Sequence, residues 1–312
     1  MEALSAGLLA ALISLGWCWV AVRLGPVLGF VDAPDGVLKT HKVTAVPLGG
    51  VGVLLGTHAG LSIVGRLDPL LLMGSLMLLA VGLADDRFGL SPVVRLSAAA
   101  SAGAIMAFGE RSLWWGLALV ALVMICVNAV NLIDGIDGLA GSTAAISLAG
   151  MGVLAISRDR PDWALPLAGC AALLGFLVWN RPPARVFLGD NGAYVTGSLL
   201  AYTSVVLARN PWEAVAGVAL IGFPLFDLAV TLLRRLRSRT PLFFGDRDHT
   251  YDRLHRLPGW SPGRVSATIG LLQALWVSFI ILSEEGVGIG PALGIAAGLG
   301  LSAVVWAATR RV

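Results

Sequence analysis

Apolar segments long enough to cross a lipid bilayer recur along the whole 312-residue chain. A window of about 19 residues finds eleven of them, near residues 3–23, 45–65, 69–84, 93–108, 113–130, 139–156, 163–179, 193–208, 213–233, 264–283 and 288–308. The third and fourth are short for a hydrocarbon core about 30 Å thick, which leaves ten crossings as the alternative. Apolar residues make up 57% of the chain, more than a soluble core can bury. We therefore predict an all-α, polytopic membrane bundle of about eleven helices, with residues 1–312 forming a single domain.

Basic residues are distributed unevenly between the two sets of connections that join these segments. If the N-terminus lies outside, the inner connections and the C-terminal tail hold 17 lysines and arginines, and the outer connections hold five. The positive-inside rule then predicts an N-out, C-in orientation. The two longest connections, after the first and ninth segments, fall on the inner side, so we expect the working surface there. A net charge of +3 gives no reason to expect a nucleic-acid partner.

Carboxylates gather at the inner ends of the predicted helices. Ionisable groups at membrane depth are costly, which makes them candidates for function. Eleven lie there: Asp32, Asp35, Asp85, Asp86, Asp134, Asp137, Asp190, Asp227, Asp246, Asp248 and Asp252. Asp85 and Asp86 end the third segment, where each opposes the other and both oppose the helix dipole. A divalent cation or a transferable proton would compensate; a solvated pair beside Arg87 is the alternative.

The segment NAVNLIDGIDGLAG, residues 128–141, spaces two asparagines and two aspartates three residues apart. Residues at that spacing share a face of a continuing helix, and the glycines let the backbone approach a ligand closely. Amide and carboxylate oxygens suit Mg²⁺, which takes one or two protein carboxylates and completes its shell with water and substrate phosphate. An ordinary turn is the alternative.

Two later segments carry the remaining candidates. Residues 179–194, WNRPPARVFLGDNGAY, combine two arginines that suit phosphate with Phe187, which can stack on a base, and with Asp190. Residues 241–260 join aspartates, arginines and histidines in a basic loop able to bind a diphosphate. A basic loop that contacts only the membrane surface is the alternative for the second segment.

Five motifs, in this order, resemble those of the polyprenyl-phosphate N-acetylhexosamine-1-phosphate transferases. The motifs are DAPDGVLKTHKVTAVPLGG (32–50), GLADDRFGLSP (82–92), NAVNLIDGIDGLAG (128–141), VFLGDNGAYVTG (186–197) and DRDHTYDRL (246–254). The family includes the MurNAc-pentapeptide translocase and the GlcNAc-1-phosphate transferases that begin O-antigen and teichoic acid synthesis. The resemblance covers nearly the whole chain, and all five motifs fall on the predicted inner face.

The resemblance implies roles for ten residues. Asp85 and Asp86 match the acidic pair that acts on the lipid phosphate, and His249 matches a histidine near the diphosphate, so these three are the expected catalytic residues. Asn131 and Asp190 match the magnesium ligands. The residues expected to bind substrate are Lys42, Asp134, Asn180, Phe187 and Arg253.

The implied activity is the transfer of an N-acetylhexosamine 1-phosphate from a UDP-sugar to undecaprenyl or another polyprenyl phosphate, with release of UMP, to begin a cell-envelope glycopolymer. The implied cofactor is Mg²⁺, with Mn²⁺ as the alternative ion. The implied partners are the UDP-N-acetylhexosamine, the polyprenyl phosphate and the membrane, and a homodimer stays open. The implied location is the bacterial cytoplasmic membrane, with the active site facing the cytoplasm.

The last motif departs from the pattern of many relatives, which have His-x-His-His where this chain has His249, Thr250, Tyr251 and Asp252. The role of the later histidines is then unfilled or taken by Arg253. Consecutive histidines are typical of the pentapeptide translocases, and the first motif is more similar to the GlcNAc-type enzymes. We therefore predict UDP-GlcNAc as the donor, with another N-acetylhexosamine as the alternative.

Two other activities remain as alternatives to GlcNAc-1-phosphate transfer. One is phospho-MurNAc-pentapeptide transfer by an enzyme of the same family. The other is ion-coupled transport, which would need polar groups near the middle of the bilayer. Only Asp227, three residues after Pro224, is placed in that way.

Overall fold

The computed structural model describes residues 2–32, 44–110, 112–242, 246–284 and 290–309. Their regular structure is helical, apart from two isolated β-bridges that join Asp32 to Ala45 and Val46 to Val186. In chain order the helices are α1 (Glu2–Leu28), α2 (Gly49–Ile63), α3 (Pro69–Phe88), α4 (Pro92–Met106), α5 (Leu113–Ile133), α6 (Leu139–Ser157), the short 3₁₀ helix η1 (Pro161–Trp163), α7 (Ala164–Asn180), α8 (Gly189–Val206), α9 (Pro211–Ala219), α10 (Phe223–Ser238), α11 (Thr250–His255), α12 (Pro262–Glu284) and α13 (Gly290–Thr309). The predicted all-α class is confirmed.

Within these residues, six helices are long and apolar enough to cross a membrane: α1, α3, α5, α6, α7 together with η1, and α12. The pair α9 and α10 passes the same test as one bent unit, and α2, α4 and most of α13 are apolar but shorter. The chain is therefore a multi-pass membrane protein. Eleven crossings and the N-out orientation stay predictions.

The prediction of one continuous helix over residues 213–233 is wrong. α9 and α10 meet there at 82°. Gly222 at the break has φ 40°, a backbone region that glycine adopts without strain. The buried Gln273 side chain of α12 accepts a hydrogen bond from the backbone N–H of Phe223 and donates one to the carbonyl of Leu220. A broken helix in lipid needs its freed backbone groups paired, and Gln273 does this.

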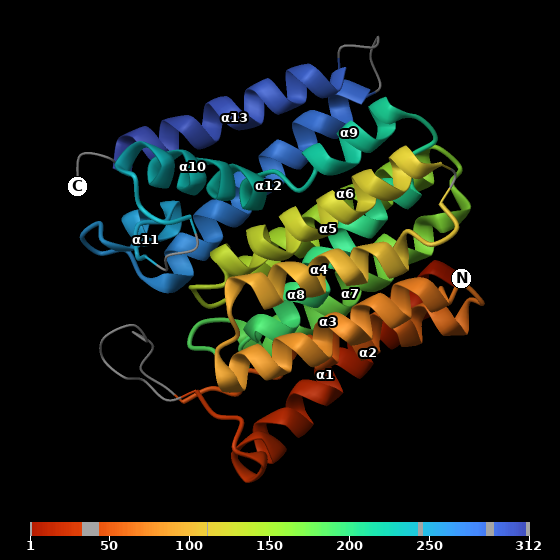
Figure 1. Ribbon diagram of the computed structural model, residues 1–312, viewed down its shortest axis with the longest axis horizontal. Coiled ribbons are helices and arrows are strands. Elements are labelled where there is room, and N and C mark those ends of the chain that lie inside the picture. Colours follow the sequence, from red (N-terminus) through yellow and green to blue (C-terminus); the bar gives the residue numbers. More distant parts are fainter. Residues whose placement is uncertain (1, 33–43, 111, 243–245, 285–289, 310–312) are drawn as a thin grey trace.

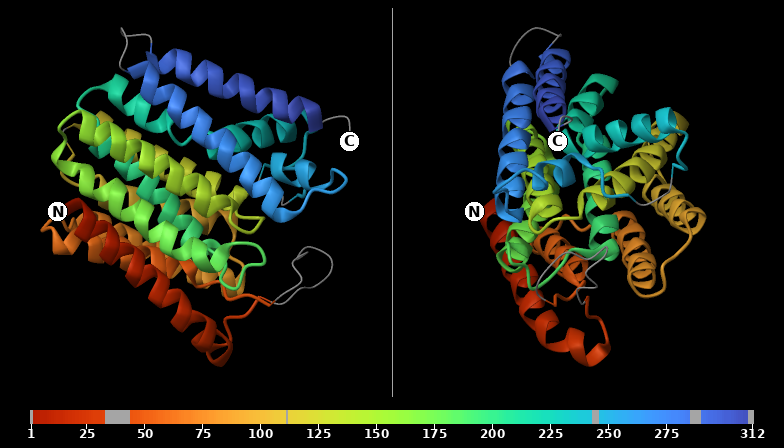
Figure 2. Two further views of the ribbon diagram at one scale, coloured as in Figure 1. Left: turned by 180° about the vertical axis from the view of Figure 1, so that it is seen from behind. Right: turned by 90° about the vertical axis from the view of Figure 1, so that its left-hand side faces the viewer.

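The helices lie side by side, and α1 begins at the end of the bundle opposite to the one where α13 finishes (Figure 1). The view from behind agrees (Figure 2). We name the end that holds residues 44–48, 134–138 and 181–188 the site end, because hydrogen bonds join these connections to one another. We name the opposite end, with residues 64–68, 158–163 and 207–210, the far end.

Helix α8 lies at the centre of the bundle, and residues 191–205 along it are all buried. Its backbone touches two neighbouring helices at glycines. A Cβ atom on Gly82 of α3 would lie 2.3 Å from Cα of Asn191, and one on Gly50 of α2 would lie 2.3 Å from Cα of Gly192. Small residues allow this close approach of helices in a membrane. The approach brings the carboxylates that end α3 against the first turn of α8.

Gly82→Ala is expected to lower the melting temperature of the protein in detergent. The added methyl group would meet backbone atoms of α8, which rotation of a side chain cannot move away, and overpacking of this kind costs about 1–3 kcal/mol. The matched control is Gly16→Ala in α1, where nothing lies within 4 Å of the added atom. Equal melting temperatures for the two variants would contradict the close packing of α3 on α8.

Candidate active site

Asp86, at the end of α3, caps the N-terminus of α8. Its carboxylate accepts hydrogen bonds from the backbone N–H groups of Asp190 at 2.8 Å and Asn191 at 3.2 Å, and from Nδ2 of Asn191 at 2.7 Å. The first N–H groups of a helix have no partner inside the helix, and the positive end of its dipole favours an anion. Asp86 therefore holds the residues of the fourth motif in place through its charge.

Asp85 faces a different set of partners. Its carboxylate accepts hydrogen bonds from the backbone N–H of Leu90 at 2.6 Å and from the hydroxyl of Tyr194 at 2.5 Å, and it lies 3.5 Å from Nε of Arg95. The side chain is buried. The repulsion within the acidic pair is thus compensated by separate hydrogen-bond donors, where the sequence led us to expect a shared cation or proton.

Asn131 and Asp190 come together although 59 residues separate them. Asn131 lies in the last turn of α5 and Asp190 in the first turn of α8, and Nδ2 of Asn131 donates a hydrogen bond to Oδ1 of Asp190. Both side chains are half-buried. Rotating the asparagine amide by half a turn would present its oxygen beside the carboxylate in place of its nitrogen.

The donor set at this point fits a magnesium ion. The described residues contain no group of three or more histidine, cysteine, aspartate or glutamate side chains arranged to hold a metal. Mg²⁺ does not need such a group, since it is commonly bound by one or two carboxylates together with water and substrate phosphate oxygens. One carboxylate from Asp190 and one amide oxygen from Asn131 match that pattern.

Asp134 follows α5 directly and adds a third carboxyl group to the same place. Burial raises the pKa of its carboxyl well above the ordinary value, and the neighbouring charges of Asp190 and Asp86 raise it further. A hydrogen bond from the backbone of Gly189 acts in the opposite direction. Three carboxyl groups close enough to influence one another make this corner of the site end a favourable place for a cation.

Asn180, expected to line the nucleotide pocket, braces the connection between α7 and α8. Its Oδ1 accepts a hydrogen bond from the backbone N–H of Gly138, and its Nδ2 donates one to the carbonyl of Val186, both at 2.9 Å. The side chain is buried. The adjoining Phe187 side chain is half-buried, and its backbone is bound to Val46 and Gly49. Asn180 therefore positions the segment that presents Phe187.

His249 is held by α10. Its Nδ1 lies 2.7 Å from Oδ2 of Asp227 and 3.2 Å from the Thr231 hydroxyl. The other carboxylate oxygen of Asp227 accepts a hydrogen bond from the backbone N–H of Thr250 at 2.9 Å. Because Asp227 accepts at Nδ1, the ring presents Nε2 as its remaining polar atom. Asp227, the one carboxylate whose sequence position suggested transport, is therefore the hydrogen-bond partner of His249.

Tyr251 joins α11 to the end of α5. Its ring stacks on His249, with centroids 5.4 Å apart and planes 4° from parallel, and its hydroxyl donates a hydrogen bond to the carbonyl of Leu132 at 3.2 Å. Gly135 makes room for it, since a Cβ there would lie 2.2 Å from the tyrosine hydroxyl oxygen. Tyr251 stands where many relatives have a histidine. Its hydrogen bond therefore attaches the last motif to Leu132, the neighbour of Asn131 in the chain.

Arg253 forms part of a charged network in the loop between α10 and α12. Its Nε and Nη2 donate to the carboxylate of Asp248 at 3.0 and 2.6 Å. Partial burial of Asp248 opposes ionisation, but these bonds, with one from Arg256, outweigh it and lower the pKa of the carboxyl. The pKa of Asp246 is lowered in the same way by Arg234 and the backbone N–H of Asp248. Arg253 here stabilises the loop.

Most of the expected site residues lie at the site end, on α3, α5, α8 and the loop that includes α11. Lys42 lies outside the described residues. Sequence reasoning missed Asn191, Tyr194 and Arg95 as partners of the acidic pair. For Asn191 a signal existed, because it follows Asp190 directly in a motif; for Tyr194 and Arg95 we find none in the sequence.

Comparisons with known proteins agree with the motifs. The family described as glycosyl transferase family 4 matches residues 69–208. A probable undecaprenyl-phosphate N-acetylglucosaminyl 1-phosphate transferase of Bacillus subtilis is 28% identical over 75% of this chain and 72% of its own length. An undecaprenyl-phosphate alpha-N-acetylglucosaminyl 1-phosphate transferase of Thermotoga maritima is 30% identical over 71% of this chain and 72% of its own length.

A phospho-N-acetylmuramoyl-pentapeptide-transferase of Bacillus mycoides also matches, with 30% identity over 43% of this chain and 41% of its own length. The family match contains the acidic pair, the asparagine and aspartate segment and the start of α8, which meet at the site end. The resemblance drawn from the five motifs is confirmed. This chain belongs to glycosyl transferase family 4.

Proposed function

We propose that this protein transfers GlcNAc 1-phosphate from UDP-GlcNAc to a polyprenyl phosphate and releases UMP. The observation that carries the proposal is the contact between Asn131 and Asp190 beside Asp86, which gathers oxygen ligands where three helices end. The relatives named for GlcNAc-1-phosphate transfer match over 71% and 75% of the chain, whereas the pentapeptide transferase matches over 43%. This difference favours a plain N-acetylhexosamine as the sugar.

The geometry suits a lipid acceptor. The isoprenoid tail of a polyprenyl phosphate stays in the bilayer among the helices, while its phosphate reaches the site end. The nucleotide sugar arrives from the aqueous side of the same end, which under the proposed N-out orientation is the cytoplasm. The donor and acceptor therefore meet where the motif-bearing connections lie, and residues 1–312 act as one transferase domain.

The reaction forms a bond from an oxygen of the lipid phosphate to the β-phosphorus of UDP-GlcNAc and breaks the bond from that phosphorus to UMP. Such transfer needs charge neutralisation on the phosphate oxygens and in-line placement of the attacking oxygen. A bound Mg²⁺, or Mn²⁺ in its place, would supply the neutralisation. Asp190 and Asn131 would hold the ion, Asp86 fixes Asp190 through the first turn of α8, and Asp227 orients His249.

Phe187→Ala is expected to raise KM for UDP-GlcNAc and the inhibition constant of UMP, with kcat close to that of the wild type. A side chain that stacks on the base contributes equally to the ground state and the transition state, so its loss weakens binding without slowing chemistry. The loss of one base-aromatic contact is worth about 1–3 kcal/mol. Phe88→Ala, which removes an exposed phenylalanine at the end of α3, is the control. Equal UMP inhibition constants for wild type and Phe187→Ala would remove Phe187 from the pocket.

Asp227→Asn is expected to lower kcat about 10- to 100-fold with little change in KM, because hydrogen bonds to a charged group contribute about 1.5–3 kcal/mol. The two carboxylate oxygens of Asp227 accept hydrogen bonds from His249 Nδ1 and from the backbone N–H of Thr250. An asparagine side chain has one oxygen and can keep only one of these bonds. Thr231→Val removes only the longer contact to His249 and should have a smaller effect. A loss of melting temperature with unchanged kcat would show that Asp227 serves only the fold.

The direct test of the proposed function is a lipid product assay. Purified protein in detergent is mixed with undecaprenyl phosphate, Mg²⁺ and one donor at a time, and both UMP and the lipid product are measured. UDP-GlcNAc should give a lipid-linked sugar diphosphate and equal amounts of UMP. Transfer from UDP-MurNAc-pentapeptide with none from UDP-GlcNAc or any other UDP-N-acetylhexosamine would overturn the proposal.

A further inference from the structure

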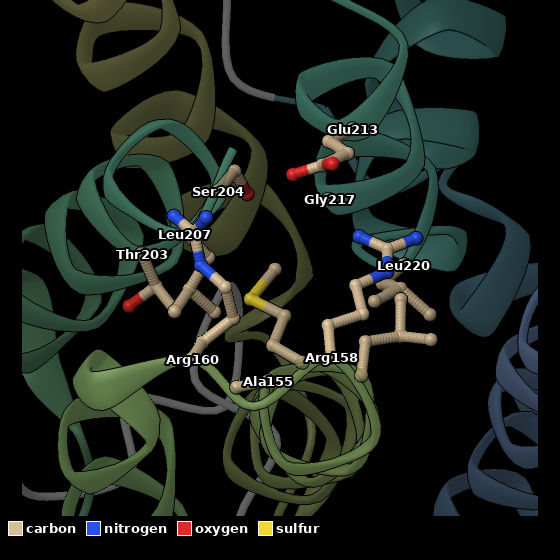
Figure 3. A pocket seen from close by; sticks show the side chains of 11 residues that line it. Ala155, Arg158, Arg160, Thr203, Ser204, Leu207, Glu213, Gly217 and Leu220 are labelled. Carbon is tan, nitrogen blue, oxygen red and sulfur yellow. The ribbon is translucent and has the colours of Figure 1, made fainter. Parts of the chain in front are cut away.

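Two arginines line a pocket at the far end of the bundle, away from the carboxylates of the site end. Arg158 and Arg160 lie in the connection between α6 and α7, and they line a small pocket that is partly open to solvent and whose enclosed part, about 20 Å³, is the size of one water molecule or one phosphate oxygen. Its walls come from α6, α8 and α9. Figure 3 shows the two guanidinium groups extending from this connection toward α8 and α9, with the carboxylate of Glu213 facing the gap between them.

Arg160 is buried, with 8% of its surface exposed. One nitrogen, Nη2, donates a hydrogen bond to the carbonyl of Val206 at the C-terminus of α8, over a long distance of 3.4 Å. Within the part of the chain that the structure describes, Nε has no hydrogen-bond partner although it is shielded from solvent. A guanidinium carries five N–H donors, and leaving a buried charged group partly unpaired is costly. The side chain is therefore arranged for an acceptor that comes from outside the chain.

Basic residues outnumber acidic ones among the residues that line the pocket. Glu213 is the only acid among its lining residues, all of which the structure describes, and it faces two arginines. Its oxygens also accept hydrogen bonds from the backbone N–H of Arg209 at 2.8 Å and from Nδ2 of Asn210 at 3.2 Å. Partial burial lowers the pKa of Arg158 from its ordinary value, and the charge of Arg160 adds to this, while Glu213 opposes it.

The position of the arginines within the fold is also informative. The connections at the far end are poor in basic residues, as expected for the outer face under the positive-inside rule. Two of the five predicted outer arginines, Arg158 and Arg160, nevertheless lie in the wall of this pocket. The same connection also holds Asp159 and Asp162, and neither of these acids lines the pocket with the two arginines.

We propose that the Arg158/Arg160 pocket binds a phosphate-class oxyanion, such as the phosphate group of an anionic membrane lipid. Guanidinium groups bind phosphate through parallel N–H donors, and basic pockets between membrane helices bind lipid headgroups. Leucines from three helices flank the guanidinium groups: Leu154, Leu207 and Leu220. Arg160 also lines a neighbouring, more open pocket of about 510 Å³ beside the start of α1, together with Ile156, Trp163 and the acidic Asp159. The larger pocket has room for the hydrocarbon part of a lipid.

The test measures binding of dioctanoyl phosphatidic acid to the purified full-length protein in phosphatidylcholine nanodiscs, by native mass spectrometry. Dioctanoyl phosphatidylcholine has the same tails without net charge, and inorganic phosphate has the charge without tails. The variants are Arg160→Gln and Arg158→Gln. The control is Arg66→Gln, an exposed arginine in another connection at the same end. Arg158→Gln keeps the test informative if Arg160→Gln, which also loses the bond to Val206, fails to fold.

Phosphatidic acid should bind the wild-type protein more tightly than phosphatidylcholine does. Each pocket variant should weaken that binding about tenfold or more, since a charge-assisted hydrogen bond contributes about 1.5–3 kcal/mol, while Arg66→Gln stays within about twofold of the wild type. Inorganic phosphate that binds as tightly as the lipid, and is lost in the pocket variants, would support the oxyanion site with a soluble occupant. Absence of binding to the wild type, or equal binding by all four proteins, would overturn the proposal whatever the transferase assay shows.

Discussion

Asp190→Asn is expected to reduce kcat about a thousandfold or more while the fold stays intact. The substitution removes one negative charge from the proposed metal site, and neutralising the phosphate oxygens through a bound cation is worth several kcal/mol, with each 1.36 kcal/mol a factor of ten in rate. The fold should survive because Asp190 meets Asp86 through its backbone N–H, which asparagine keeps. An asparagine oxygen can also still accept the hydrogen bond from Asn131.

The measurement is UMP release by purified protein over a titration of Mg²⁺, together with the melting temperature. The matched control is Asp159→Asn at the far end, where φ is 50° and asparagine is as well tolerated as aspartate. The control should match the wild type in kcat and stability. A wild-type kcat for Asp190→Asn at saturating Mg²⁺ would show that the assignment of Asp190 to the metal is wrong. Asn131→Ala should act in the same direction as Asp190→Asn.

Asp86→Asn is expected to lower kcat about a hundredfold and also to lower the melting temperature. The carboxylate of Asp86 accepts three hydrogen bonds from Asp190 and Asn191, and an asparagine would present an NH₂ group to N–H donors on one side. Losing hydrogen bonds to a charged group and leaving a donor unpaired costs about 1.5–3 kcal/mol or more. The N-terminus of α8 would then lose its anionic cap, and Asp190 in the first turn, the proposed metal ligand, would be displaced.

The effects on kcat and on melting temperature, taken together, distinguish capping of α8 by Asp86 from direct catalysis by Asp86. Asp190→Asn should change kcat at constant stability, whereas Asp86→Asn should change both, with KM for UDP-GlcNAc little affected. Thermal unfolding and steady-state kinetics on the same preparations give the two quantities. A strongly reduced kcat for Asp86→Asn with an unchanged melting temperature would instead indicate that Asp86 acts on the lipid phosphate directly.

Several properties of the protein follow from local patterns in the sequence. The helical class and most helix positions could be predicted, because a backbone in lipid must pair its own polar groups and because apolar length is visible along the chain. The candidate site could be located to particular motifs for a related reason, since a cluster of aspartates and asparagines at helix ends is costly without a function. The break at Gly222 was missed, since it depends on Gln273, a side chain 51 residues further along that replaces the lost helical hydrogen bonds.

Only the tertiary structure decided what each polar side chain does. Asp85 and Asp86 look like one pair in the sequence, yet one binds Tyr194 and the turn after α3, and the other caps α8 more than 100 residues away. Asn180 matched a pocket residue but braces a connection, and Asp227 matched a transport residue but holds His249. A side chain hydrogen-bonds with whichever groups the packing of helices brings within about 3 Å. Sequence spacing shows which groups are available, and the close approach of α3, α5 and α8 selects their partners.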